Sequence, residues 1–122
     1  MKVLIVEDEI MAQKSLVRLL AQNFPDITVV NILSSVKGVV SWLKENPGAV
    51  DIIFMDVELA DGVCFEIFRQ TDVKAKVIMT TAYDHYAVKA FETGSVDYLL
   101  KPLNQDDVTR LFLKIAEDLK KG

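Results

Sequence analysis

The chain has 122 residues, a length that suits one domain, and 51% of them are hydrophobic, as is usual for a soluble globular protein. Its 14 basic and 18 acidic residues give a net charge of −4, and this acidic balance without a basic stripe argues against direct nucleic-acid binding. A single cysteine excludes a disulfide framework, and no apolar run approaches the roughly 20 residues that a membrane-spanning helix needs. Since the chain also starts with a strand pattern instead of a signal-peptide layout, we expect a cytoplasmic protein that does not contact a membrane.

Apolar patterning predicts that strands and helices alternate five times along the chain. In chain order, the pattern predicts a strand over residues 2–6, a helix over 10–24, a strand over 27–33, a helix over 36–43, a strand over 52–55, a helix over 63–70, a strand over 76–80, a helix over 86–92 and a strand over 96–100. A last helix follows Pro102, with apolar residues at helical spacing at Val108, Leu111, Phe112, Ile115, Ala116 and Leu119. Residues 56–62 are expected to form a loop.

Strictly alternating strands and helices imply right-handed crossovers and a parallel sheet covered by helices on both faces. We therefore predict an α/β fold with a doubly wound, flavodoxin-like, five-stranded parallel sheet in the order 2-1-3-4-5. The unbroken apolar run 52–55 is typical of a central strand that is buried on both faces. In this order the first and third strands are neighbours, so Glu7, Asp8 and Asp56 are expected to meet at one edge.

Three carboxylates at one sheet edge repel one another. Two unit charges about 4 Å apart cost on the order of 4 kcal/mol at an effective dielectric constant of about 20. The cluster of Glu7, Asp8 and Asp56 therefore indicates a bound cation, and an oxygen-only ligand set favours Mg²⁺, followed by Mn²⁺ or Ca²⁺. The alternative is that Glu7 or Asp8 simply caps the helix that follows.

Polar residues also end the fourth and fifth predicted strands. Lys101 directly follows the fifth strand, from which it can reach across the sheet edge to an anion, and the Lys101–Pro102 peptide bond is a candidate for the cis isomer. The alternative is an ordinary surface lysine before a proline that starts a helix. Thr80 and Thr81 end the fourth strand, where a hydroxyl can donate to a phosphoryl oxygen, although threonine is also simply a good strand residue.

Together these features resemble the receiver domains of response regulators in two-component systems, and the resemblance covers the whole chain. The features that match the family occur in order: the acidic pair Glu7-Asp8, the phospho-acceptor position Asp56, the switch hydroxyl Thr81, the aromatic switch position Tyr98 and Lys101-Pro102. The stretches 80–84 and 98–103 resemble most the LytR/AlgR subgroup, in which the receiver precedes a LytTR-type DNA-binding domain that this chain lacks. Ala60 stands where many receivers carry proline, which we expect to alter loop stiffness and not the chemistry.

The resemblance implies that Asp56 takes a phosphoryl group from a phosphohistidine on a sensor histidine kinase. It also implies that Mg²⁺ is held by Asp8, Asp56 and the backbone carbonyl of Glu58, with Glu7 acting through water. Lys101 and Thr81 would bind the phosphoryl oxygens, in catalysis by positioning and charge stabilisation. Residues 1–122 would then be a receiver domain and not an enzyme, with at most intrinsic autophosphorylation and autodephosphorylation.

The same resemblance implies how the signal leaves the site. Thr81 would move to the phosphoryl group and Tyr98 would turn inward, so that the face made by helix 86–92, strand 96–100 and the last helix changes. We expect a homodimer through that face, and we expect the output to be transcription regulation by a C-terminal effector domain outside this chain.

Two other functions stay open from the residues alone. The same acids and Lys101 would suit a metal-dependent phosphohydrolase, although the Asp56-Val57-Glu58 signature belongs after the first strand in haloacid-dehalogenase-type phosphatases and the chain has no room for a substrate cap. A phosphorylation-independent interaction domain could also share the fold.

Four phenylalanines are expected in the core because they lie at helical spacing: Phe65, Phe68, Phe91 and Phe112.

Overall fold

The computed structural model of the chain describes the backbone of residues 1–121 and the side chains of residues 1–117. Five strands form one parallel sheet: β1 (Lys2–Val6), β2 (Thr28–Leu33), β3 (Ile52–Asp56), β6 (Lys76–Thr81) and β7 (Asp97–Leu100). Their spatial order is β2-β1-β3-β6-β7. This confirms the predicted doubly wound sheet of order 2-1-3-4-5, because β6 and β7 are its fourth and fifth strands.

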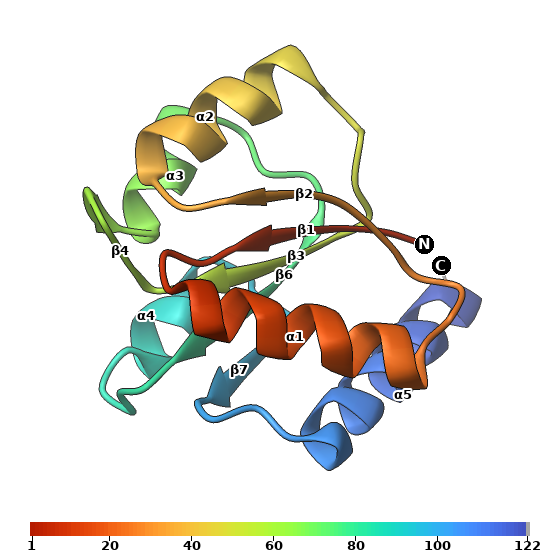
Figure 1. Ribbon diagram of the computed structural model, residues 1–122. Coiled ribbons are helices and arrows are strands. Elements are labelled where there is room, and N and C mark those ends of the chain that lie inside the picture. The colour runs from red at the N-terminus through yellow and green to blue at the C-terminus, as the bar shows by residue number, and fades with distance from the viewer. Residues whose placement is uncertain (122) are drawn as a thin grey trace.

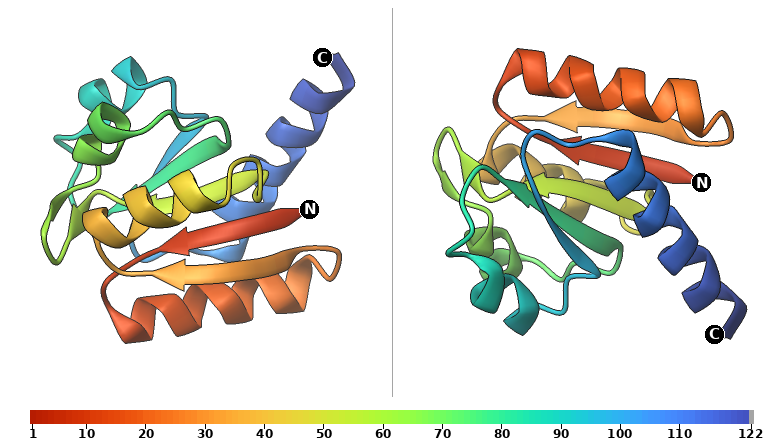
Figure 2. Two further views of the ribbon diagram at one scale, coloured as in Figure 1. Left: turned by 90° about the horizontal axis from the view of Figure 1, so that it is seen from above. Right: turned by 90° about the horizontal axis from the view of Figure 1, so that it is seen from below.

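Helices cover both faces of this sheet, as Figures 1 and 2 show. The helices are α1 (Ile10–Asn23), α2 (Val36–Glu45), α3 (Phe65–Gln70), α4 (Ala87–Glu92) and α5 (Gln105–Lys121). Buried side chains of α1 and α5 form one apolar cluster with the sheet, and those of α2, α3 and α4 form another on the opposite face. Among the described residues, no helix combines the length and the apolar character that a membrane crossing requires.

The central strand β3 contributes to both apolar clusters. Ile53 and Met55 lie in the cluster with α2, α3 and α4, whereas Ile52 and Phe54 lie in the cluster with α1 and α5. All four side chains are buried, and each contributes about 1.5–3 kcal/mol by leaving water. Burial on both faces explains why this strand has no polar residue before Asp56.

The segment predicted as a loop over 56–62 is instead partly a small hairpin. Its strands β4 (Glu58–Leu59) and β5 (Gly62–Val63) pair antiparallel. The amide of Cys64 donates to the carbonyl of Val57 at 2.7 Å, and Gly62 has a φ of 148°, a conformation that favours glycine. Because Val63 belongs to the hairpin, α3 begins two residues later than predicted, at Phe65.

The prediction that Phe91 is a core residue is wrong, since its side chain is 83% exposed. Helix α4 has only six residues and buries Ala90 alone, so the remaining face of the helix lies in solvent. The other three phenylalanines do pack on the core, Phe65 and Phe68 on one side and Phe112 on the other. The predicted core position Leu119 lies outside the side chains that the structure describes.

Helix α2 is capped from two places in the sequence. The Ser35 hydroxyl accepts from the amide of Gly38 at 3.0 Å. From the hairpin, the Asp61 carboxylate accepts from the amides of Val36 at 2.7 Å and Lys37 at 3.1 Å. The hydrogen bonds from Lys37 and Val36 hold the pKa of Asp61 below its ordinary value of 3.8. Asp61 therefore connects the loop that follows Asp56 to the start of α2.

We predict that Asp61→Ala lowers the free energy of unfolding by about 0.5–1 kcal/mol at neutral pH, at the low end for a lost cap because solvent screens this exposed carboxylate. The native pKa of Asp61 is lowered, so its contribution is present above 3.8 and is lost as pH falls through the native pKa. Urea unfolding of both proteins at about pH 7 and about pH 3 measures the difference.

The control for this prediction is Asp72→Ala, which removes an exposed acid with no hydrogen bond among the described residues. A destabilisation by Asp61→Ala that is equal at both pH values, or that is matched by Asp72→Ala, would contradict a charged cap.

Candidate functional site

The carboxyl ends of four strands bring the predicted site residues to one edge of the sheet. Glu7 and Asp8 follow β1, Asp56 ends β3, Thr81 ends β6 and Lys101 follows β7. The strand register places Asp56 beside Thr80. The edge contains a hollow of about 240 Å³ lined by Asp8, Glu9, Asp56, Glu58, Leu59, Thr81, Ala82, Tyr83 and Lys101.

Three carboxylates converge at this edge, as the sequence predicted. Glu7, Asp8 and Asp56 each place one carboxylate oxygen so that all three oxygens lie within 4.8 Å of one another. Glu7 and Asp56 are each only 5% exposed, whereas Asp8 lies in solvent. Carboxylate oxygens without a histidine or thiolate in the set suit a hard divalent cation such as Mg²⁺, so the donor set fits the predicted metal.

The alternative that Glu7 or Asp8 caps α1 is wrong. The N-cap residue of α1 is Glu9, and its side chain makes no capping hydrogen bond. The carboxylate of Glu7 points back to the site and accepts from the amide of Glu9 at 3.1 Å. The backbone carbonyl of Glu7 also accepts from the side-chain amide of Gln13 at 2.6 Å. This bond ties Glu7, just after the C-terminal end of β1, to helix α1.

Lys101 joins the two buried carboxylates. Its ammonium donates to Asp56 Oδ2 at 3.1 Å and forms an ion pair with Glu7. A longer contact of 3.9 Å reaches Glu9, which the sequence analysis did not single out. The Lys101–Pro102 peptide bond is cis. Lys101 therefore reaches across the sheet edge to the carboxylates of Glu7 and Asp56.

The contacts within the cluster shift the pKa values of its carboxyl groups in different directions. Burial, and next the hydrogen bond and negative charge of Glu7, raise the pKa of Asp56 to about 7. Burial alone would raise the pKa of Glu7, but hydrogen bonds with Lys101 and Asp56 outweigh it and lower that pKa. Burial, followed by the neighbouring Glu7, raises the pKa of Asp8. The pKa of Lys101 is raised because Glu7 and Asp56 outweigh the cost of its burial.

The two predicted switch residues meet at the backbone of Tyr83. Thr81 is 1% exposed, and its hydroxyl oxygen accepts from the amide of Tyr83 at 3.2 Å. The hydroxyl of Tyr98 donates to the carbonyl of the same residue, and burial raises the pKa of Tyr98. Thr81 and Tyr98 are thus connected through one peptide segment in this structure.

Sequence reasoning missed a contact at the rim of the site. The Tyr86 hydroxyl donates to the Glu58 carboxylate at 2.8 Å, and the amide of Glu58 donates to Asp56 Oδ1 at 3.3 Å. Tyr86 and Glu58 are 28 residues apart. No local spacing could have predicted this pair, because only the tertiary fold brings α4 beside the hairpin.

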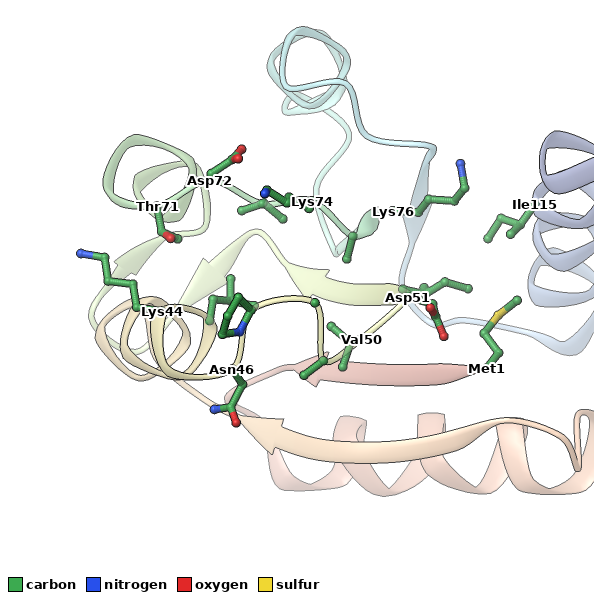
Figure 3. Close-up of a pocket in the computed structure, with 17 residues that line it drawn as sticks. Met1, Lys44, Asn46, Val50, Asp51, Thr71, Asp72, Lys74, Lys76 and Ile115 are labelled. Carbon is green, nitrogen blue, oxygen red and sulfur yellow. The ribbon is translucent and has the colours of Figure 1, made fainter. Parts of the chain in front are cut away.

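A second hollow, of about 820 Å³, lies at the opposite ends of the strands (Figure 3). Its lining includes Met1 and Asp51 beside the starts of β1 and β3, and Ile115 of α5. None of the predicted site residues lines it. The predicted site residues are therefore gathered at the carboxyl edge of the sheet, where open α/β sheets commonly bind ligands.

Comparison with known proteins agrees with this geometry. Residues 3–112 match the family model of the response regulator receiver domain. The sensory transduction protein LytR of Streptococcus mutans is 35% identical over 96% of this chain and 49% of its own length, and LytT of Enterococcus faecalis is 33% identical over 98% and 49%. The chain thus spans about half the length of these curated relatives.

Solved structures show the same fold. The response regulatory domain of protein mrkE from Klebsiella pneumoniae has a TM-score of 0.83 and 31% identity, with full coverage of both chains. A CheY-like receiver domain protein from Methanospirillum hungatei has a TM-score of 0.79 at 24% identity, covering 99% of this chain and 98% of that one, and supports the fold alone. The chain therefore belongs to the response regulator receiver domain family, and its LytR and LytT relatives agree with the LytTR-type subgroup that its motifs resemble.

Proposed function

We propose that residues 1–122 are a receiver domain that accepts a phosphoryl group on Asp56 from a phosphohistidine of a sensor histidine kinase. The observation that carries this proposal is the buried Asp56 carboxylate, held at 3.1 Å from the Lys101 ammonium inside the acid cluster. A carboxylate with a pKa of about 7 is charged in a large fraction of molecules at neutral pH, which a nucleophile requires.

In the transfer step a carboxylate oxygen of Asp56 bonds to phosphorus while the phosphorus–nitrogen bond to the histidine breaks. The electron pair of that bond stays on the imidazole nitrogen, which takes up a proton. Lys101 holds the reactive carboxylate in place and donates to a phosphoryl oxygen, and the Thr81 hydroxyl donates to another. Since little general acid–base work is needed, the residues act by positioning and charge stabilisation, as expected of a phospho-acceptor that is not an enzyme.

The acid cluster would hold Mg²⁺, or Mn²⁺ in its place. Asp8, Asp56 and the backbone carbonyl of Glu58 would bind the ion directly, with Glu7 acting through water. When bound, the ion would offset negative charge on the phosphoryl oxygens. The negative charges of Glu7 and Asp56 would attract the ion, and the ammonium of Lys101 offsets part of those charges.

The output surface that we propose is the face formed by α4, β7 and α5 (the α4–β7–α5 face). Thr81 would move toward the phosphoryl group and draw Tyr83 with it, and Tyr98 would turn inward. Large apolar side chains are exposed on this face: Val88 and Phe91 on α4, Leu100 on β7 and Leu113 on α5. Such side chains support dimerisation through the face.

We further propose that the whole protein is a cytoplasmic transcription regulator. A related protein of Escherichia coli, 32% identical over 98% of this chain, is the transcriptional regulatory protein BtsR, and the chain spans 50% of its length. The receiver itself, with its net charge of −4, would not bind DNA. A LytTR-type effector domain C-terminal to the receiver would do so.

We predict that Asp56→Asn abolishes phosphorylation by acetyl phosphate in the presence of Mg²⁺, because an amide oxygen is a poor nucleophile. Intact-protein mass spectrometry should show the added mass of one phosphoryl group in the wild type and in the control Asp72→Asn, and none in Asp56→Asn. Phosphate on the Asp56→Asn protein would refute the assignment. Rapid repeated hydrolysis of phosphomonoesters by the wild type would favour a metal-dependent phosphohydrolase instead.

Mg²⁺ affinity should depend on pH because the ion and a proton compete for Asp56. Its pKa of about 7 predicts that the apparent affinity rises about tenfold per pH unit below that value and levels off above it. Lys101→Met should move the midpoint of this rise in Mg²⁺ affinity to higher pH, since the lysine lowers the pKa of Asp56. Lys101→Arg keeps the positive charge and should leave the midpoint closer to that of the wild type. Calorimetric titration from about pH 5.5 to about pH 8.5 measures this, and a flat profile would contradict it.

We predict that Phe91→Ser weakens the dimer formed with beryllofluoride and Mg²⁺ by roughly tenfold or more, as for other aromatic anchors at interfaces. Sedimentation velocity over a range of protein concentrations measures the dissociation constant. Met11→Ser is the matched control, because Met11 is 74% exposed on α1, a helix that is not part of the α4–β7–α5 face. Equal effects of both substitutions would place the interface elsewhere.

A further inference from the structure

The hydrogen bond between Tyr86 and Glu58 joins the start of α4 to the segment that follows the phospho-acceptor. The donor is the Tyr86 hydroxyl and the acceptor is the Glu58 carboxylate, at 2.8 Å. The charge on the acceptor strengthens this bond, and its exposure to solvent limits that gain. Neither the metal site nor the path from Thr81 to Tyr98 uses this bond, so it requires a separate explanation.

At one end of the bond, the backbone of Glu58 is tied to the reactive carboxylate. Its amide donates to Asp56 Oδ1 at 3.3 Å. Its β4 segment pairs with Val63, and the preceding amide of Val57 donates to the carbonyl of Thr80 at 3.0 Å. Glu58 is therefore in direct contact with the carboxylate whose charge and position would change on phosphorylation.

At the other end, the ring of Tyr86 is fixed to α3 and α4. Tyr86 is the N-cap residue of α4, and its carbonyl accepts from the amide of Ala90 at 2.9 Å. Its ring centroid lies 6.1 Å from that of Phe65 and 4.2 Å from that of His85. The bond from the Tyr86 hydroxyl to Glu58 therefore connects the hairpin to the start of α4.

Phosphorylation would work against this bond in two ways. Thr81 and Tyr86 are the two ends of one short segment, so a shift of Thr81 toward Asp56 displaces the segment between them. The phosphoryl group also adds about −1.5 to −2 charges beside the Glu58 carboxylate, which would be repelled. Both effects would weaken the bond from Tyr86 to Glu58 in the phosphorylated protein.

We propose that Tyr86 and Glu58 form a positioning pair that holds the start of α4 in its unphosphorylated place, as a second connection between Asp56 and the α4–β7–α5 face. The inference rests on the proposed function, because it needs phosphorylation to shift α4. A bond present in only one of two states biases the equilibrium between them. Removing it must therefore favour the phosphorylated arrangement.

The test is Tyr86→Phe, which removes one hydroxyl and keeps the ring that packs on Phe65. The amide signal of Gly94 is a suitable NMR reporter, because this residue lies two positions after the end of α4 and its amide donates to the carbonyl of Phe91 at 3.1 Å. Without any phosphoryl analogue, the Gly94 signal of the variant should move toward the position that beryllofluoride and Mg²⁺ produce in the wild type. We expect a roughly 3- to 10-fold higher ratio of the active to the resting arrangement.

Two substitutions at Glu58 separate the hydrogen bond from the charge. Glu58→Gln keeps a side-chain oxygen that can accept from Tyr86, so its Gly94 signal should stay near that of the wild type. Glu58→Ala should shift the Gly94 signal as Tyr86→Phe does. The double variant Glu58→Ala/Tyr86→Phe should show the same shift as either single variant. The amide of Gly48, in the hollow at the opposite ends of the strands, is the internal control and should not move.

The outcomes distinguish this inference from the proposed function. If beryllofluoride and Mg²⁺ do not shift the Gly94 signal of the wild type, the proposed function is refuted, and the positioning pair with it. A responsive wild type with an unshifted Tyr86→Phe protein, additive single changes, or Glu58→Gln behaving like Glu58→Ala refutes the positioning pair alone.

Discussion

The ion pair of Lys101 with Glu7 and Asp56 is the interaction on which this site depends. Two carboxyl groups that are each 5% exposed lie side by side at the sheet edge, and the ammonium of Lys101 offsets their negative charge. Leaving such a buried charge without its partner commonly costs about 3–5 kcal/mol. The three residues come from the ends of β1, β3 and β7, so the contact exists only in this strand order. The fold and the charge balance of the site therefore depend on each other.

This charge balance also explains why one acid in the cluster differs from its neighbours. Lys101 favours the charged form of Glu7, whose pKa is lowered, whereas burial and the neighbouring Glu7 raise the pKa of Asp56 to about 7. A group whose charge changes near neutral pH responds to a bound cation or phosphoryl group. Glu58, whose amide donates to Asp56, leads toward α4 through its bond with Tyr86. Thr81, which lines the same hollow as Asp56, leads toward Tyr98 through the backbone of Tyr83. A local change of charge at Asp56 thus has short physical routes to an exposed apolar face.

Much of this arrangement could be predicted from the sequence because it follows from two regular patterns. The apolar run before Asp56 indicates a central strand, and alternating strands and helices determine which strand ends meet. These patterns placed Glu7, Asp8, Asp56, Thr81 and Lys101 at one edge, as the structure does.

What could not be predicted depends on contacts between distant segments or on very short elements. The hairpin strands β4 and β5 have two residues each, too few for a periodic signal. Phe91 has core-like spacing but lies on a helix that buries a single residue. The cap that Asp61 gives to α2 and the bond from Tyr86 to Glu58 span 25 and 28 residues. Such contacts appear only when the elements are packed together.

The central claim is that Asp56, and neither Glu7 nor Asp8, becomes the phosphorylated carboxylate. Borohydride reduces an acyl phosphate to an alcohol, so it converts a phosphorylated aspartate to homoserine. The most direct measurement is peptide mass mapping of the wild-type protein after treatment with acetyl phosphate, Mg²⁺ and borohydride. We expect homoserine at position 56 alone. Reduction at Glu7 or Asp8 with Asp56 intact would contradict it.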